Sequence, residues 1–266
     1  MILLCERPPA EAGEVSRRRS VLAVVAPLAV LMLAAGCSAG SEDETTTIRV
    51  FAAASLTDAF ADIERAFETT EPEVDVQLNL AGSSTLRDQI AAGAPFEVLA
   101  TANATIMTDV VSTGAVDDPV DFATNQLQLA VPAGNPATVD ELADLARPEL
   151  FVGLCAAGVP CGDLADDALA AAGVIASVDT REPNVRALLT KVIEAELDAG
   201  LVYATDVVGE PGVTGIELPT GSQVEARYPI AAASSGDRAA VADRFIDFVT
   251  GPDGQAILSK HGFGQP

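Results

Sequence analysis

The sequence predicts an α/β protein of two lobes, each a mainly parallel sheet flanked by helices. Strand-like and helix-like segments alternate after residue 47, which is typical of parallel strands joined by crossover helices. At about 150 residues per domain, the 266 residues suit one large or two small domains. Hydrophobic residues make up 49% of the chain, which is enough apolar material for a sizeable core.

The first half of the folded region predicts a βαβαβ order. In chain order, the segments are a strand over 48–53, a helix over 56–67, a strand over 74–80, a helix around Leu86 and Ile90, and a strand over 96–100. The apolar residues of the first helix recur at a spacing that places them on one face. Gly93 follows the second helix as a plausible C-cap.

The second half repeats the alternation with different contents. Strands are predicted over 127–131, 150–155, 201–204 and 228–232, and helices over 139–146, 164–172, 184–197, 239–249 and 255–259. No Pro- or Gly-rich linker separates the halves, so two segments near 123–130 and 220–228 are expected to cross between lobes. Lobe 1 is then 48–126 with 225–266, and lobe 2 is 127–224.

Residues 1–36 are predicted to be an export signal. The cluster Arg17-Arg18-Arg19 precedes an uncharged apolar run over 21–35, and small residues follow before Cys37. The run is short for a membrane span, although an uncleaved anchor helix remains an alternative. Leu33-Ala34-Ala35-Gly36-Cys37 resembles the bacterial lipoprotein signal, which implies lipidation of Cys37. Residues 37–47 are predicted to be a flexible tether.

The cysteine count changes once the signal is removed. Cys5 leaves with the signal and Cys37 is the lipidation site, so Cys155 and Cys161 remain. In an exported protein, a local disulfide between them is the simplest state, with two free thiols as the alternative. A zinc site is disfavoured, because His261 is the single histidine and no further cysteines are available.

Charge and motifs exclude several function classes. With 39 acidic and 15 basic residues, the net charge of −24 argues against nucleic-acid binding. The sequence has no phosphate-binding loop, dinucleotide fingerprint, zinc-protease motif or nucleophile elbow. His261 lies in the last six residues, where we expect it to cap the end of a helix and not to act as a catalytic base. The chain is therefore not expected to be an enzyme.

Small polar residues gather where predicted strands end and helices begin: Ser55, and the segments 82–85, 160–162 and 183–185. In open α/β sheets these junctions lie along one edge, where ligands bind. Helix N-termini there offer unpaired N–H groups and a positive potential, which suit an oxyanion. Each serine is also a plausible helix cap, and that alternative stays open at this point.

Two motifs carry a resemblance to a known family. Val-Phe-Ala-Ala-Ala-Ser-Leu-Thr at 50–57 and Ala-Gly-Ser-Ser-Thr-Leu at 81–86 resemble the molybdate-binding proteins of bacterial ABC importers. Further matches are Gln89-Ile90, Gly93-Ala94-Pro95, the segment 202–206, Gly251-Pro252 and Gly262-Phe263, so the resemblance spans 47–264.

The resemblance implies a periplasmic-binding-protein type II fold, with a tetrahedral oxyanion held between the lobes. Its ligand residues fall on the hydroxyls of Ser55, Ser83 and Tyr203 and on the backbone N–H groups of Cys161 and Val185. The family usually has Ala at the place of Cys161, and its pattern at 82–84 leaves Ser84 as a substitute for Ser83. Asp206 could orient Tyr203, and Arg186 is treated as a flanking residue.

The implied function is that of an extracytoplasmic, lipid-anchored binding protein. It would capture molybdate or tungstate without a cofactor, deliver the anion to an ABC permease, and act as a monomer. A dianion can be held by neutral donors, so the acidic composition is no obstacle. The alternatives are a binding protein for another small anion such as sulfate, and an anion-sensing lipoprotein. A serine hydrolase using Ser55 or Ser83 would lack a credible base.

Overall fold

The computed structural model describes residues 45–266. The predicted signal over 1–36 and the lipidation site Cys37 lie outside the described residues, as does most of the predicted tether. Strand β1 (Thr46–Ala53) already begins within the last two tether residues.

The first part of the described chain contains η1 (Ala54–Leu56), α1 (Thr57–Thr70), β2 (Val74–Ala81), α2 (Ser83–Ala91), β3 (Val98–Ala100), α3 (Ala104–Ser112) and β4 (Val120–Pro132). The middle part contains η2 (Leu142–Ala146), β5 (Val152–Cys155), α4 (Pro160–Ala172), β6 (Val178–Glu182), α5 (Val185–Ile193), β7 (Ala199–Tyr203), α6 (Ala204–Val207) and β8 (Val213–Glu217). The last part contains η3 (Thr220–Ser222), β9 (Glu225–Ala232), α7 (Ala239–Thr250) and α8 (Pro252–Lys260).

The strands follow the order β2-β1-β3-β9-β4-β7-β5-β6, with β8 paired to β4. We call β1, β2 and β3 the first strand group, and β5, β6, β7 and β8 the second strand group. The pairs β1–β2, β1–β3, β5–β6 and β5–β7 are parallel. The antiparallel pairs all involve β4 or β9. Parallel order thus holds inside each group.

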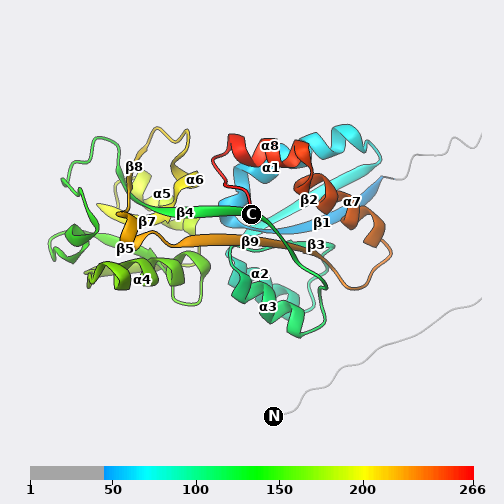
Figure 1. Ribbon diagram of the computed structural model, residues 1–266, viewed down its shortest axis with the longest axis horizontal. Coiled ribbons are helices and arrows are strands. Elements are labelled where there is room, and N and C mark those ends of the chain that lie inside the picture. Colours follow the sequence, from blue (N-terminus) through cyan, green and yellow to red (C-terminus); the bar gives the residue numbers. More distant parts are fainter. Residues whose placement is uncertain (1–44) are drawn as a thin grey trace, which may run out of the picture. The chain divides into compact units, whose positions relative to one another are not determined.

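Strands β4 and β9 pass from one strand group to the other (Figure 1). The first half of β4 pairs with β9 over 120–126, and its second half pairs with β7 and β8 over 127–132. The other end of β9 pairs with β3. If one strand group moves relative to the other, strands β4 and β9 therefore have to bend or twist.

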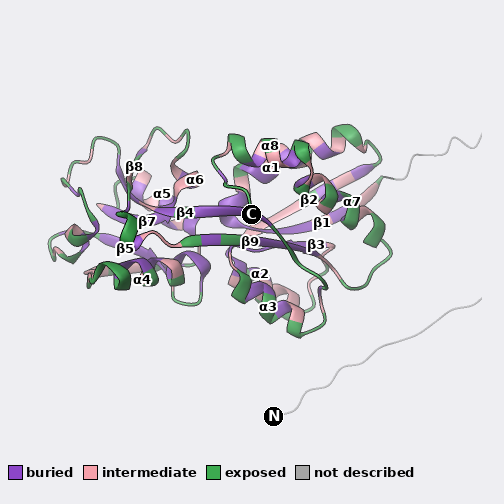
Figure 2. Cartoon of the chain, viewed as in Figure 1, coloured by how far each residue is buried: buried purple, intermediate pink, exposed green. Residues whose placement is uncertain are grey.

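Strand β1 is buried on both faces. Val50 and Ala52 join the larger core, whereas Phe51 lies in a second cluster with Leu86 of α2 and Met107 of α3. Successive side chains of a strand point to opposite faces, so a strand covered on both sides is apolar throughout. Helices α1, α7 and α8 supply one cover and α2 and α3 the other, and burial follows this layering (Figure 2).

Several elements differ from the sequence prediction. Helix α3 and strands β6 and β8 were not predicted, and the helix predicted over 139–146 is only the short η2. Both ends of the Asn135 amide bond the backbone of Val139 at 3.0 Å, which ties this segment into a turn. The helix predicted over 184–197 ends at Ile193, because Ala195 adopts a left-handed φ of 55°.

Among residues 45–266, no helix combines the length and the apolar character that crossing a membrane requires.

Candidate functional site

One small cavity is lined by all five residues that the sequence singled out: Ser55, Ser83, Cys161, Val185 and Tyr203. The volume of the cavity that is open to the centre of a water molecule is about 10 Å³, so its walls lie close together. Ser55 and Ser83 come from the first strand group, and the other three come from the second. Because both groups contribute, the cavity exists only when they lie against each other.

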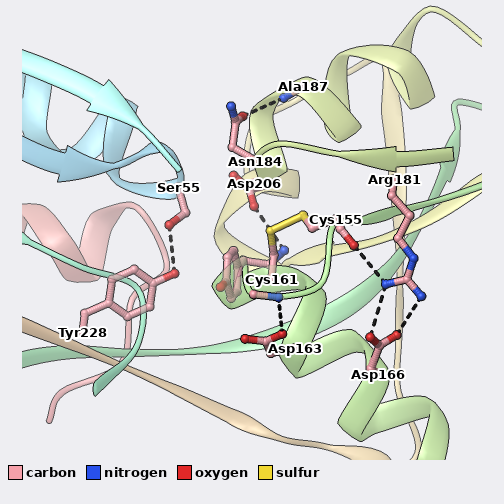
Figure 3. Close-up of a disulfide and its surroundings, with 12 residues drawn as sticks. Ser55, Cys155, Cys161, Asp163, Asp166, Arg181, Asn184, Ala187, Asp206 and Tyr228 are labelled. Carbon is pink, nitrogen blue, oxygen red and sulfur yellow. Dashed lines mark hydrogen bonds and ion pairs between the residues drawn. A yellow bond between two sulfur atoms is a disulfide. The ribbon is translucent and has the colours of Figure 1, made fainter. Parts of the chain in front are cut away.

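Neither serine acts as a helix cap. Ser55 lies in η1 directly after β1, and its Oγ is 2.9 Å from the hydroxyl of Tyr228 (Figure 3). Ser83 is the first residue of α2, and its Oγ accepts a hydrogen bond of 3.0 Å from the backbone N–H of Ala102. Both serines are buried, and Ser84 does not line the cavity. The structure thus places Ser83, rather than Ser84, at the site.

Two helices point their first residues at the same cavity. Cys161 is the second residue of α4, after Pro160, and Val185 is the first residue of α5. N–H groups at these positions have no acceptor within their own helix, and the helix dipole makes this end positive. The side chain of Asn184 caps α5 by accepting from the N–H of Ala187 at 3.0 Å. The N–H of Val185 is left available to a ligand.

A disulfide shapes the start of α4. Cys155 at the end of β5 is bonded to Cys161, with their Cα atoms 5.7 Å apart (Figure 3). Gly162 lets the helix approach the intervening loop, since a Cβ there would lie 2.1 Å from the carbonyl oxygen of Ala156. The backbone donor at Cys161 therefore sits in a covalently closed loop.

Tyr203 brings a free donor to the cavity. The residue ends β7 and is 1% exposed, and its hydroxyl has no hydrogen-bond partner among the described residues. Burial, reinforced by Tyr228 and Asp206, raises the pKa of this hydroxyl well above its usual range, so it keeps its proton. A buried hydroxyl without a partner costs free energy, which indicates that an acceptor belongs there.

Sequence reasoning missed two residues beside the cavity, Tyr228 on β9 and Asn125 on β4. The Tyr228 hydroxyl lies between Ser55 Oγ and the amide nitrogen of Asn125, which is 3.4 Å away. The rings of Tyr228 and Tyr203 meet edge to face, with centroids 6.0 Å apart. Their positions in the sequence could have indicated them, because Asn125 falls within one of the two segments predicted to cross between the lobes and Tyr228 is the last residue of the other.

Arg186 is more than a flanking residue. It forms an ion pair with Asp58 of α1, and its Nε lies 3.4 Å from Oδ1 of the buried Asp206. Burial raises the pKa of Asp206 to about 7, against the opposing effect of Arg186. The other oxygen of Asp206 accepts from the backbone N–H of Tyr203 at 3.1 Å, as expected for a residue that orients Tyr203.

A larger hollow of about 290 Å³ adjoins the cavity and also reaches Ser55. Its lining includes the carboxylates of Asp58, Asp206 and Glu210 beside the single guanidinium of Arg186, so acidic groups outnumber the arginine there and disfavour an anion. The smaller cavity has no charged side chain in its lining. Electrostatics therefore favour the small cavity for an anion, held by neutral hydroxyl and N–H donors.

Two strand groups, linked by two strands and enclosing a cavity of hydrogen-bond donors, define a solute-binding protein of the periplasmic type. The bacterial extracellular solute-binding protein family matches residues 48–264, so the chain belongs to this family. Because the family consists of solute-binding proteins, the prediction that the chain is not an enzyme is confirmed.

The resemblance to molybdate-binding proteins is also confirmed. The molybdate-binding protein ModA of Mycobacterium tuberculosis is 37% identical over 234 residues, covering 87% of this chain and 90% of the relative. ModA of Escherichia coli is 33% identical over 261 residues, covering 92% and 98%. The periplasmic molybdate-binding protein of Azotobacter vinelandii superposes with a TM-score of 0.74 at 18% identity, covering 82% and 99%. This superposition confirms the periplasmic-binding-protein fold.

Proposed function

We propose that this chain captures molybdate, and also tungstate, in the small cavity, and delivers the anion to an ABC permease. The observation that carries the proposal is the convergence of five donors on one cavity without a charged side chain. Two helix N-termini and three hydroxyls suit the four oxygens of a tetrahedral dianion. The anion is a transported ligand and not a cofactor.

Capture follows from the division of the donors between the two strand groups. Lobe 1, residues 48–126 with 225–266, brings Ser55 and Ser83, and lobe 2, residues 127–224, brings the other three donors. An anion that bridges the lobes favours their closed arrangement, because only that arrangement offers all the contacts. The closed form is then the one that a permease recognises.

The proposed location is the outer face of the cell membrane, with the chain anchored through a lipidated Cys37 and acting as a monomer. The Leu-Ala-Ala-Gly-Cys segment at 33–37 supports the anchor. Two or more acyl chains hold a protein stably at a membrane. Replacing the site by Cys37→Ser is expected to move the chain from the membrane fraction to the soluble fraction of expressing bacteria. Unchanged fractionation would reject lipidation.

Thermal unfolding with single anions tests the proposed ligand. Molybdate and tungstate at about 100 times their Kd should each add about 2.7 kcal/mol to the free energy of unfolding. Sulfate stabilising more than molybdate would favour the sulfate alternative. If molybdate, tungstate, sulfate and phosphate all leave the Tm unchanged, the oxyanion function is wrong.

Two serine variants test the site itself. Ser55→Ala and Ser83→Ala should each weaken molybdate binding roughly 10-fold or more, while the ligand-free protein stays within about 1 kcal/mol of the parent. Ser84→Ala is the matched control, since Ser84 lies outside the cavity. Large destabilisation with unchanged affinity would make both serines structural.

A further inference from the structure

We propose that Asn125 and Tyr228 are positioning residues that turn the Ser55 hydroxyl proton into the anion cavity. The inference rests on the proposed oxyanion function and adds two residues from the strands that link the lobes. Asn125 lies on β4 and Tyr228 on β9, and both are buried. Their effect follows from the direction of three consecutive hydrogen bonds.

The orientation of the Asn125 amide is the first step. Its Oδ1 accepts from the backbone N–H of Gln126 at 2.9 Å, and an N–H can only donate, so this end of the amide is the oxygen. The amide nitrogen therefore faces Thr205 Oγ1 at 2.8 Å and the hydroxyl of Tyr228 at 3.4 Å. An amide nitrogen has two protons and no acceptor capacity, so Tyr228 receives a hydrogen bond.

The direction of the Tyr228–Ser55 bond is the second step. Either oxygen of this 2.9 Å pair is able to donate. The hydrogen bond from Asn125 occupies one acceptor position of the Tyr228 oxygen, which favours the arrangement in which Tyr228 donates its own proton to Ser55 Oγ. Burial raises the pKa of the Tyr228 hydroxyl, so the proton stays on it. Ser55 is thus an acceptor towards Tyr228, and its own proton is free to point elsewhere.

The proton of the Ser55 hydroxyl is able to point into the cavity. Ser55 lines the cavity, so a proton not used on Tyr228 is available to an anion bound there. Ser83 is arranged in the same way, since its Oγ accepts from the N–H of Ala102. The hydroxyl of Tyr203 has no competing partner among the described residues. All three hydroxyls therefore present protons, as binding of an oxyanion requires.

Without Asn125, the pair would have a second arrangement. Ser55 would then be able to donate to Tyr228 and turn its oxygen lone pairs, instead of its proton, towards the anion. A hydroxyl in that state repels a dianion. Asn125 thus selects one of two directions for the hydrogen bond between Tyr228 and Ser55. The second proton of its amide nitrogen is donated to Thr205 of α6, which directly follows Tyr203 and β7.

A double-mutant cycle on the full chain tests this role, with sodium molybdate as the titrant in calorimetry. Tyr228→Phe keeps the ring and removes the hydroxyl. It is expected to weaken binding roughly 10-fold in the parent, and less than about twofold when Ser55 is already Ala. The ligand-free Tm is measured in parallel, so that a loss of folding is seen separately from a loss of affinity.

Asn125→Leu is the second variant, because it removes the fixed donor and keeps the size of the side chain. Its effect on affinity should likewise disappear in the Ser55→Ala background. Tyr203→Phe serves as the comparison, since a direct donor should lose affinity whether or not Ser55 is present.

The outcomes separate the two proposals. If the parent binds molybdate and Tyr228→Phe binds it equally well, the positioning role is wrong and the oxyanion function stands. Equal losses in the Ser55 and Ser55→Ala backgrounds also overturn the positioning role. A parent chain that binds no oxyanion overturns the function and this inference together.

Discussion

Gly82 follows β2 of the first strand group and Pro183 follows β6 of the second, and they meet so closely that a Cβ on Gly82 would lie 2.6 Å from the carbonyl oxygen of Pro183. The backbone of Gly82 has a φ of −58°, which any residue can adopt, so the constraint is this contact alone. The strand–helix junctions that precede Ser83 and Val185 therefore approach each other at the cavity only because residue 82 lacks a side chain.

Gly82→Ala is accordingly expected to hinder closure. The added methyl group would hold the two junctions apart and weaken molybdate binding at least about tenfold, with little change in secondary structure. Calorimetry measures the affinity. Gly221→Ala is a matched control, because a Cβ there meets nothing within 4 Å. Equal affinities of the Gly82 variant and the parent would mean that the junctions need not meet.

Tyr203→Phe is expected to separate stability from binding. The variant removes a buried hydroxyl that has no partner among the described residues, so the ligand-free protein should be as stable as the parent or more stable. A hydrogen bond to a charged group contributes about 1.5–3 kcal/mol, so molybdate affinity should fall roughly 10- to 100-fold. Denaturant unfolding and calorimetry give the two quantities. Lower stability with unchanged affinity would contradict the proposed role of the hydroxyl.

Removing the disulfide by Cys155→Ala with Cys161→Ala should affect both stability and binding. The bridge closes a short loop, with a sequence separation of 6, so its loss should cost about 2 kcal/mol of unfolding free energy. The N–H of residue 161 would be held less firmly, and affinity should fall several-fold. The free energy of unfolding and the molybdate affinity are each measured on the disulfide-bonded parent and on the variant. An unchanged affinity would show that α4 alone holds this donor in place.

The buried carboxyl of Asp206 predicts a pH dependence of stability. Its pKa is about 7 in the folded chain and near 3.8 when exposed, mainly because burial disfavours the charge. Between these values the folded state binds more protons, so the free energy of unfolding should decrease as pH rises from 4 to 7. The slope from this group is up to about 1.4 kcal/mol per pH unit, and it vanishes above the folded pKa.

Asp206→Asn tests this assignment, because it removes the titration and keeps the size of the side chain. The variant's unfolding free energy, measured by urea titration at several pH values, should decrease less between pH 4 and 7 than that of the parent. Asp58→Asn removes the exposed partner of Arg186 and serves as the control for charge. Parallel pH profiles of parent and Asp206 variant would show that another group carries the dependence.

The sequence determined the order of most elements, and its resemblance to the family predicted five residues that line one cavity in the structure. Strand and helix patterns are local, so the βα junctions at Ser55 and Ser83 were visible as turns between an apolar run and a helical repeat. Helix α3 and strands β6 and β8 are among the elements that were missed, because their local signals are weak. Strand β6, for example, has one apolar residue in Val-Asp-Thr-Arg-Glu and draws its place from pairing with β5.

Only the tertiary structure decided which donors are free to bind. Ser55 and Tyr228 are 173 residues apart in the chain, and they meet because β9 lies between β4 and β3 in the sheet and pairs with both. The contact of Asn125 with Thr205 depends on β4 in the same way. Residue types state which groups are able to donate a hydrogen bond. The direction in which a buried hydroxyl donates its hydrogen bond depends on the groups around it. For Ser55 those groups lie far away in the sequence, and the order of the strands in the sheet brings them together.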